Sequence, residues 1–458
     1  YNPKNPESRR IQETLFYEKQ TIIENCLFGV DINPNSVKIC RLRLWIELLK
    51  NAYYQTSPLT SFPQGEGNLG ELQTLPNIDI NIKTGNSLIS RFPLNWDLRT
   101  ILKKSAWNIE SYRNAIKTYL HPDNKDQKQE MERLINDIKG NISTEISSND
   151  PNIEKRNQKV AELRHLRDQK SLFVESKAEA KSRQQKQEKL EQEINQLNSE
   201  IEDKKSGKIY QNAFEWRFEF PEVLNDEGDF IGFDVVIGNP PYISLSKIKE
   251  KNQTAYFENN YQTYTKGADI YCLFYEKGSC LLRKEGFLTY ITSNSWLKTI
   301  YGDLLKKYLI ENLQPQTLLN IEDMQIFEEA TVESNIFILK KDQVNEFFNV
   351  ASLTNNYLIG SSLNEYFDKN CFQFIIPNTS EWIIGNQETV SLKQKIEQSS
   401  KLLKEFDINI NRGLLTGLNA AFIINEETKN QLIAESSNSA EIIQPILRGR
   451  DLKKYSYE

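Results

Sequence analysis

The tetrapeptide Asn239-Pro240-Pro241-Tyr242 combines residue types that can bind a planar base. The two prolines fix φ and remove two backbone donors, so we expect a rigid loop. This loop presents the side-chain carbonyl of Asn239 and the backbone carbonyl of Pro240 as hydrogen-bond acceptors. Two such acceptors suit an exocyclic amino group, and the ring of Tyr242 can stack on the face of the same base. The alternative is a plain turn with a packed tyrosine.

The strands that must position these residues end in polar side chains. The tetrapeptide directly follows residues 233–238, an apolar run that predicts a buried strand. Asp31 follows a short predicted strand, and Asn86 follows an alternating stretch that breaks at Gly85. Ligands of open α/β sheets bind outside the carboxyl ends of the strands. Asp31 is therefore placed to accept hydrogen bonds from ribose hydroxyls, although a strand-terminal Asp is often only a helix cap or turn former.

Strand and helix patterns alternate along much of the chain. Pro34 stands where a first helical turn accepts proline, and apolar residues recur at helical spacing after it. Beyond residue 206 the patterns predict helices at 268–286 and 296–312, and strands at 286–292, 317–323 and 333–341. This alternation predicts an α/β sheet with helices on both faces.

Residues 96–205 differ in composition, being rich in Lys, Glu, Gln and Asn. Within them Leu190, Ile194, Leu197 and Ile201 recur at alternating steps of four and three, which is the seam of a coiled coil. Residues 131–140 and 160–169 are the candidate opposing helices. A solvated helical insertion with a structural role is one interpretation, and contact with DNA or a partner is the other.

Composition bounds the class of protein. A chain of 458 residues predicts two or three domains, and no apolar stretch approaches the roughly 20 residues of a membrane span. Five cysteines without a CxxC pair and two histidines argue against a zinc site, a disulfide framework and a histidine-based triad. We therefore expect no metal and a cytoplasmic protein. The net charge of -6 gives no global signal for nucleic acid binding.

An ordered set of motifs extends the argument from residues to a family. Along the chain stand GVDINP, TGNSL, FDVVIGNPPYI, GFLTYITSNSWL and ATVESNIFILKK. In this order they resemble the gamma class of DNA adenine-N6 methyltransferases of restriction–modification systems, above all the TaqI-like and fused type IIG enzymes. The resemblance implies a Rossmann-like, S-adenosylmethionine-dependent methyltransferase sheet. It divides the chain into a first core part (1–95), the insertion (96–205), a second core part (206–345) and a partial C-terminal recognition domain (346–458).

The resemblance also implies roles for individual residues. Asp31 would hold the ribose of S-adenosylmethionine, and the cofactor site would further include Ile32, Asn86, Ser87 and Asn239. Asn239, Pro240, Pro241 and Tyr242 would form the catalytic loop, in which Asn239 and Pro240 bind the amino group of a flipped-out adenine. Tyr242 and Tyr290 would stack on the two faces of that base, and Asp269 would line its pocket.

The implied activity is site-specific methylation of adenine N6 in double-stranded DNA. A protein-glutamine or RNA methyltransferase that shares the Asn-Pro-Pro-Tyr motif is one alternative, and a DNA-binding fragment without catalytic activity is another. The resemblance further implies a nuclease domain or subunit in the parent protein.

The sequence departs from the family pattern at the Gly-rich cofactor loop, which is absent before Asp31. The one GxGxxG, at residues 65–70, follows no strand pattern and is rejected as that loop. We therefore expect a fragment that begins after the first strand. At the other end RGLLTGLNAAFII and LRGRDLKKY resemble the start of a recognition domain. There Arg448, Arg450, Lys453 and Lys454 form a small basic cluster that either contacts phosphate or is ordinary surface charge.

Overall fold

The computed structural model divides the chain into two compact units, residues 1–384 and 385–458. The residues that it describes are 5–53, 77–96, 108–122, 124–148, 150–168, 177–322, 333–377, 382, 384, 387–401, 405–408, 422–446, 452–453 and 456–457. Two predicted features, the GxGxxG at 65–70 and most of the segment RGLLTGLNAAFII, lie outside these residues, as do Arg448, Arg450 and Lys454.

The first unit begins with two helices and a small parallel sheet. Its elements are α1 (Pro6–Asn25), β1 (Gly29–Asp31), α2 (Pro34–Leu49), the short 3-10 helix η1 (Ile78–Ile80) and β2 (Ile82–Thr84). The helix predicted to begin at Pro34 is confirmed as α2. The side chain of Asn33 caps the N-terminus of α2 by accepting a hydrogen bond from the backbone N–H of Asn35. Buried apolar residues of α1 and α2, including Phe16 and Leu48, pack together with Ile78.

A six-stranded mixed sheet forms the centre of the unit, and it confirms the predicted α/β class. The strands lie in the order β3-β4-β6-β5-β7-β8. Their bounds are β3 (Phe233–Gly238), β4 (Leu282–Ser293), β5 (Gln314–Ile321), β6 (Ser334–Lys340), β7 (Phe347–Leu353) and β8 (Phe372–Ile375). β3 and β4 are parallel, whereas β6 runs antiparallel to β4 and to β5.

Residues 233–238 form a strand as predicted, but the prediction that this strand is buried is wrong for some of its side chains. β3 pairs only with β4 among the described residues, so it is an edge strand. Val235 and Ile237 are 55% and 78% exposed as a result. An apolar run indicates a strand, but it does not tell how many neighbours the strand has.

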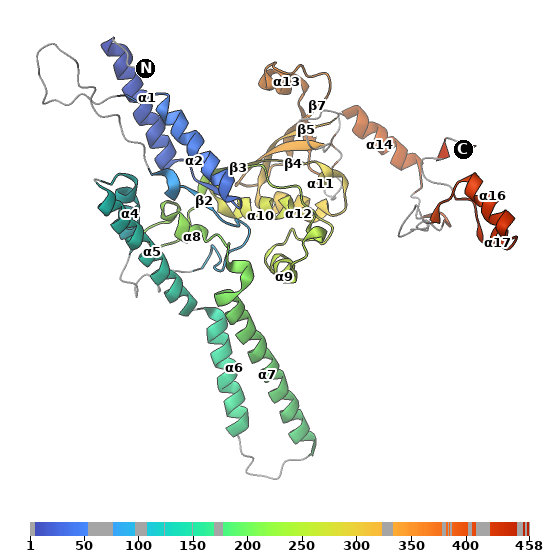
Figure 1. Cartoon of the computed structure of the whole chain (residues 1–458), viewed down its shortest axis with the longest axis horizontal. Coiled ribbons are helices and arrows are strands. Elements are labelled where there is room, and N and C mark those ends of the chain that lie inside the picture. Colours follow the sequence, from blue (N-terminus) through green and yellow to red (C-terminus); the bar gives the residue numbers. More distant parts are fainter. Residues whose placement is uncertain are drawn as a thin grey trace, which may run out of the picture. The chain divides into compact units, whose positions relative to one another are not determined.

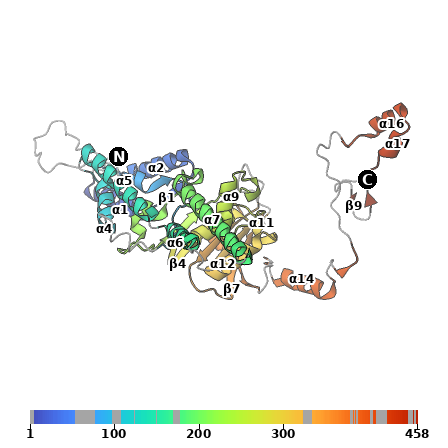
Figure 2. The same ribbon diagram turned by 90° about the horizontal axis from the view of Figure 1, so that it is seen from below.

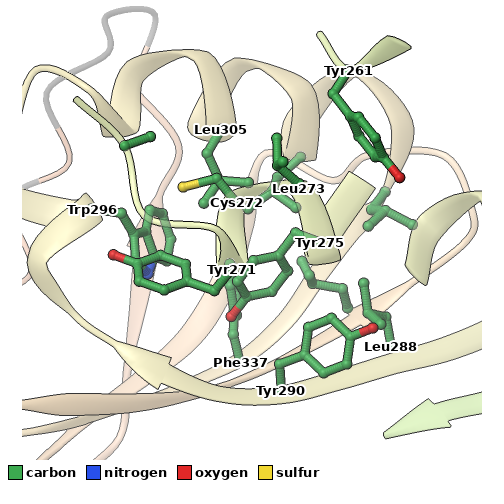
Figure 3. Packing of buried hydrophobic residues seen from close by; sticks show 14 of the residues in the cluster. Tyr261, Tyr271, Cys272, Leu273, Tyr275, Leu288, Tyr290, Trp296, Leu305 and Phe337 are labelled. Carbon is green, nitrogen blue, oxygen red and sulfur yellow. The ribbon is translucent and has the colours of Figure 1, made fainter. Parts of the chain in front are cut away.

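Short helices surround the sheet and complete its core. They are α8 (Trp216–Glu219), α9 (Lys251–Asn260), α10 (Tyr271–Leu281), α11 (Ser295–Lys298) and α12 (Gly302–Asn312), with 3-10 turns η2 (Lys208–Tyr210), η3 (Pro221–Val223) and η4 (Leu245–Lys247). Side chains of α10, such as Tyr271 and Tyr275, pack with Leu288 of β4 and Phe337 of β6 in the main hydrophobic core (Figure 3). Gly278 fits where α10 crosses β4, because a Cβ there would lie 2.7 Å from a Leu288 methyl.

The sheet continues beyond residue 345, where the second core part was expected to end. β7 pairs in parallel with β5, and β8 pairs with β7. Helix α13 (Leu363–Asn370) connects them. Ala351 and Leu353 of β7 are buried with Leu319 and Ile321 of β5, so these strands share one core.

The charged insertion is helical in its described part. It contains α4 (Ile109–Leu120), α5 (Lys125–Ser148), α6 (Pro151–Asp168) and α7 (Lys177–Ser206). Helices α6 and α7 lie side by side (Figures 1 and 2) and are joined by ion pairs such as Lys159–Glu193. Leu190 and Ile201 of the predicted seam are buried, while Ile194 and Leu197 are half-buried.

Of the two candidate partners for this seam, residues 160–169 are confirmed and residues 131–140 are not. Residues 131–140 lie in α5, which packs against α4 instead. Ile135 and Ile138 of α5 are buried with Tyr112 and Ile116 of α4.

The second unit contains α14 (Gln387–Ser399), α16 (Glu426–Glu435), α17 (Ser439–Ile442) and a two-stranded ladder of β9 (Leu452–Lys453) and β10 (Ser456–Tyr457). Helices α16 and α17 bury none of their residues. In the part of the chain that the structure describes, no helix is long and apolar enough to cross a membrane.

Candidate active site

Two of the predicted site residues meet at the carboxyl end of the small sheet. β1 and β2 are parallel and pair Asp31 with Thr84. The backbone N–H of Gly85 donates to the carbonyl oxygen of Asp31 at 3.0 Å, so Asn86 follows immediately beyond the same edge. Sequence reasoning predicted both strand ends, and the parallel pairing brings them together.

The polar groups at this edge fit an S-adenosylmethionine molecule. One carboxylate oxygen of Asp31 accepts from the backbone N–H of Asn33 at 2.6 Å, and the other makes no hydrogen bond to a described residue. The side-chain oxygen of Asn86 accepts from Leu88 N–H at 3.1 Å, which leaves its amide NH2 without a partner in the described part of the chain. An available acceptor at Asp31 suits ribose hydroxyls, and an available donor at Asn86 suits a ring nitrogen of adenine. Ile32 is exposed beside Asp31 and Ser87 is half-buried beside Asn86.

The Asn-Pro-Pro-Tyr loop leaves the carboxyl end of β3 as predicted. Asn239 is exposed, and its side chain makes no hydrogen bond to the described residues. Pro240 is buried and Pro241 is exposed. The amide group of Asn239 is therefore available to a ligand, while the proline behind it anchors the loop to the protein.

Tyr242 turns back toward the sheet. Its ring meets Tyr271 of α10 edge to face, with the centroids 6.2 Å apart. Its hydroxyl lies against the side chain of Ser334 at the start of β6, and burial raises the pKa of this hydroxyl. Contacts at both the ring and the hydroxyl therefore fix how the half-buried Tyr242 is oriented.

Asp269 lies beside this loop. Ser244 and Asp269 form an isolated antiparallel bridge, in which Ile270 N–H donates to the Ile243 carbonyl oxygen at 2.8 Å. The hydroxyl of Tyr301 donates to the Asp269 carboxylate at 3.3 Å. The structure thus brings the predicted pocket residue Asp269 next to the tetrapeptide.

Tyr301 was not found from the sequence, and it connects several groups of the site. Its hydroxyl lies 3.0 Å from that of Tyr271. Burial raises the pKa of both hydroxyls, so both remain neutral donors near pH 7. A tyrosine in a loop carries no sequence signal for such a role, since only the fold brings residue 301 beside residue 269.

Tyr290 is buried in the core, and its backbone pairs with Gly238, the residue directly before Asn239. It is 5% exposed near the carboxyl end of β4, and its ring meets Tyr275 at a centroid distance of 5.3 Å (Figure 3). A Cβ added at Gly278 would come within 2.7 Å of the Tyr290 hydroxyl, which shows how closely α10 covers this ring. The ring thus lies between α10 and the end of β3, and its stacking on a base stays a prediction.

The two parts of the candidate site are joined through the loop after β2. The hydroxyl of Tyr261 donates to the Leu88 carbonyl oxygen, and Tyr256 of α9 exchanges hydrogen bonds with the backbone of Ser90 at 3.1 and 2.9 Å. The loop that carries Asn86 is therefore fastened to the part of the chain that follows the tetrapeptide. Among the described residues, no group of three or more His, Cys, Asp or Glu could hold a metal ion.

The small sheet presents Asp31 and Asn86 at its strand ends, and the six-stranded sheet presents the Asn-Pro-Pro-Tyr loop. This combination indicates a methyltransferase. The chain belongs to the Eco57I restriction-modification methylase family, whose model matches residues 25–327. S-adenosylmethionine is the cofactor that this family implies, and the groups at Asp31 and Asn86 fit it.

Individual relatives agree with this family. The chain is 27% identical over 368 residues to RM.MjaORFECS2P of Methanocaldococcus jannaschii, a match that covers 72% of this chain and 27% of the relative. It is 24% identical to the type II restriction enzyme and methyltransferase RM.Eco57I of Escherichia coli over 43% of this chain and 20% of the relative. It is also 24% identical to the type II methyltransferase M.BstVI of Geobacillus stearothermophilus, over 44% of this chain and 39% of the relative.

The chain thus spans between 20% and 39% of the length of these three relatives. Among solved structures, the type I restriction-modification methyltransferase subunit of Streptococcus thermophilus matches 30% of this chain and 30% of its own, with 17% identity and a TM-score of 0.25. A TM-score this low adds nothing to the description of the fold.

Proposed function

We propose that the protein transfers the methyl group of S-adenosylmethionine to N6 of an adenine in double-stranded DNA, at specific sites, as the modification activity of a restriction–modification system. One observation carries this proposal. The side-chain amide of Asn239 is exposed and makes no hydrogen bond to the described residues, and it lies at the carboxyl end of β3 in the same loop as Tyr242.

Two acceptors explain how such a loop would activate an amino group. The lone pair of the adenine amino group is delocalised into the ring, which makes the nitrogen planar and weakly nucleophilic. The Asn239 carbonyl and the Pro240 backbone carbonyl each accept one N–H, which favours a pyramidal nitrogen with a localised lone pair. Positioning and preorganised dipoles then contribute most of the rate, without a strong general base.

The target adenine must leave the base stack to reach this loop, because its amino group is paired inside the duplex. Tyr242 offers an aromatic face to an extruded base, and contacts with Tyr271 and Ser334 hold that ring in place. Base stacking on an aromatic side chain contributes about 1–3 kcal/mol per base. The preorganised ring thus offsets part of the cost of unstacking.

S-adenosylmethionine would supply an electrophilic methyl group bound to a sulfonium. Asp31 would accept hydrogen bonds from its ribose and Asn86 would donate to its adenine, as their available polar groups indicate. The loop from Asn86 to Ser90 is fastened to α9, so the cofactor residues and the tetrapeptide are held by connected elements.

The experiment is a methyl-transfer assay with purified protein and S-adenosylmethionine labelled in the methyl group. Unmethylated duplex DNA, total RNA and a protein extract would be offered as separate acceptors. We expect label in DNA alone, and digestion of that DNA should release N6-methyl-2′-deoxyadenosine. Label in RNA or in protein glutamine would favour the alternative substrates that share the motif, and label in deoxycytidine would contradict the assignment of adenine.

A further inference from the structure

Residues 212–216, which follow the charged helices α6 and α7, run alongside the loop 85–92. The backbone N–H of Asn86 donates to the Asn212 carbonyl oxygen at 2.6 Å, and Phe214 N–H donates to the Ile89 carbonyl oxygen at 2.9 Å. The indole N–H of Trp216 donates to the Ser87 carbonyl oxygen at 3.2 Å. The loop with two proposed cofactor residues therefore forms hydrogen bonds along its length to one neighbouring segment.

The side chain of Glu215 contacts the far end of this loop. Its carboxylate accepts from the backbone N–H of Arg91 at 2.7 Å and from that of Phe92 at 3.4 Å. A carboxylate that accepts two consecutive N–H groups fixes the backbone more firmly than a neutral acceptor does. Glu215 thus holds the backbone at residues 91 and 92, next to Ser90, which Tyr256 and Lys277 contact.

Close packing holds the near end of the loop. A Cβ added at Gly85 would lie 2.7 Å from the ring of Phe214. A residue larger than glycine would therefore push the loop away from residues 212–216. The position directly before Asn86 consequently requires the absence of a side chain.

Two cations and one hydroxyl group lie near the Glu215 carboxylate. Arg91 and the buried ammonium of Lys277 are the cations beside its carboxylate, and Tyr256 is the neighbouring hydroxyl. Lys277 also donates to the Ser90 hydroxyl at 3.3 Å. The carboxylate lies among groups that contact the loop, and it is distant in sequence from every residue assigned to the cofactor.

We propose that Glu215 is a positioning residue for the cofactor: it holds the backbone of residues 91 and 92 and thereby fixes Asn86 and Ser87 against S-adenosylmethionine. This inference rests on the proposed function, because it assumes that Asn86 and Ser87 bind the cofactor. Glu215 itself does not touch the reacting atoms.

The test is calorimetric titration of the folded protein with S-adenosylmethionine at pH 8, for wild type and Glu215→Gln. A glutamine has one acceptor oxygen and places an NH2 against the second backbone N–H. We expect the Kd for S-adenosylmethionine to rise at least fivefold, and we expect the KM for DNA to change less than twofold. Gly85→Ala, which displaces the other end of the loop, should raise the same Kd without touching a charge.

Glu276 offers a matched control. Its buried carboxylate also accepts from two consecutive backbone N–H groups, those of Gln262 and Thr263, at 3.1 and 2.9 Å. Residues 262 and 263 include no cofactor residue and follow Tyr261, whose hydroxyl contacts the Leu88 carbonyl. Glu276→Gln removes the same chemistry there and leaves the contacts of residues 91 and 92 in place, so the Kd for S-adenosylmethionine should stay within twofold of wild type. An equal rise in Kd in Glu276→Gln would show that Glu215→Gln acts through general destabilisation of the protein. This result would overturn the inference.

The pH dependence of the Kd for S-adenosylmethionine distinguishes a positioning role of Glu215 from a merely structural one. Protonation of Glu215 removes the charge that holds Arg91 and Phe92, so lowering the pH from 8 to 6 should weaken cofactor binding more in wild type than in Glu215→Gln. Titration of the cofactor itself affects both proteins alike and cancels in this comparison. Equal Kd values for wild type and Glu215→Gln at pH 8 would overturn the inference but not the proposed function. A wild-type protein that binds no S-adenosylmethionine would overturn both.

Discussion

The rings of Tyr242 and Tyr271 meet edge to face, with centroids 6.2 Å apart and planes at 85°. Tyr271 is fully buried and its hydroxyl reaches that of Tyr301, which in turn donates to Asp269. The aromatic residue of the Asn-Pro-Pro-Tyr loop therefore belongs to a connected group that extends to α10 and to the segment before α12. Edge-to-face pairs of this kind are worth about 0.5–1.5 kcal/mol beyond the area they bury.

Tyr242→Ala should lower kcat/KM for DNA by between about 5-fold and 150-fold, since stacking on a base contributes about 1–3 kcal/mol. Tyr242→Phe keeps the ring and loses only the hydroxyl against Ser334, so its kcat/KM should stay within about fivefold of wild type. Steady-state methylation of duplex DNA checks both values. Equal losses in the two variants would show that the hydroxyl, and not the ring, carries the function of Tyr242.

Tyr301→Phe removes the hydroxyl between Asp269 and Tyr271. Losing a neutral hydrogen bond costs about 1 kcal/mol, so we expect a decrease of roughly fivefold in kcat/KM for DNA and an unchanged Kd for S-adenosylmethionine. Ser361, whose hydroxyl donates to the Leu358 carbonyl oxygen on an exposed turn, provides a control in Ser361→Ala. A weakened cofactor Kd in Tyr301→Phe would place this tyrosine in the cofactor site instead.

Glu215 should make protein stability fall as the pH rises from about 4.5 to about 7. Burial of its carboxyl group raises the pKa from 4.5 to about 7, so the folded state holds a proton that the unfolded state has released. The stabilisation is fully present below pH 4.5 and is lost as the pH rises through 7, by at most about 3 kcal/mol. Urea unfolding of wild type and Glu215→Gln at several pH values measures the difference. A difference that is constant with pH would contradict the raised pKa.

Cysteine reactivity tests the packing of α10. Cys272 is fully buried, and this burial raises the pKa of its thiol, whereas Cys26 and Cys280 are exposed. Because the thiolate is the reactive form, alkylation in native protein should modify Cys26 and Cys280 and spare Cys272. Mass spectrometry of the digested protein locates the label. Modification of Cys272 at the rate of Cys26 would show that the core around α10 is open.

The sequence predicted those parts of the fold that depend on local patterns. Pro34 after Asn33 marked the start of α2, and the break at Gly85 marked the end of β2, because caps and turns depend on residues close in the chain. The tetrapeptide at 239–242 was placed at a strand end for the same reason. These predictions needed no information about distant segments.

Other predictions failed where distant segments decide the outcome. The apolar run of β3 indicated a buried strand, yet Val235 and Ile237 are exposed because one edge of β3 has no partner among the described residues. Residues 131–140 have the apolar spacing of a partner for α7, yet they pack on α4. Periodicity shows that a helix has an apolar face, but it does not identify what that face contacts.

In the candidate site too, the sequence predicted the residues that depend on local patterns and missed those that depend on distant segments. Asp31, Asn86 and Asn239 lie at strand ends, where sequence spacing could place them. Glu215 and Tyr301 act through residues more than 30 positions away in the chain, so no spacing could reveal them.

Asn239→Ala tests the central claim most directly, because the proposed mechanism requires its side-chain carbonyl. Methyl transfer to duplex DNA and the Kd for S-adenosylmethionine would be measured on the same preparations of wild type and variant. We predict that wild type forms N6-methyladenine, and that the variant loses methyl transfer while its cofactor Kd stays within a few-fold of wild type. An Asn239→Ala protein that methylates adenine at the wild-type rate would contradict the account.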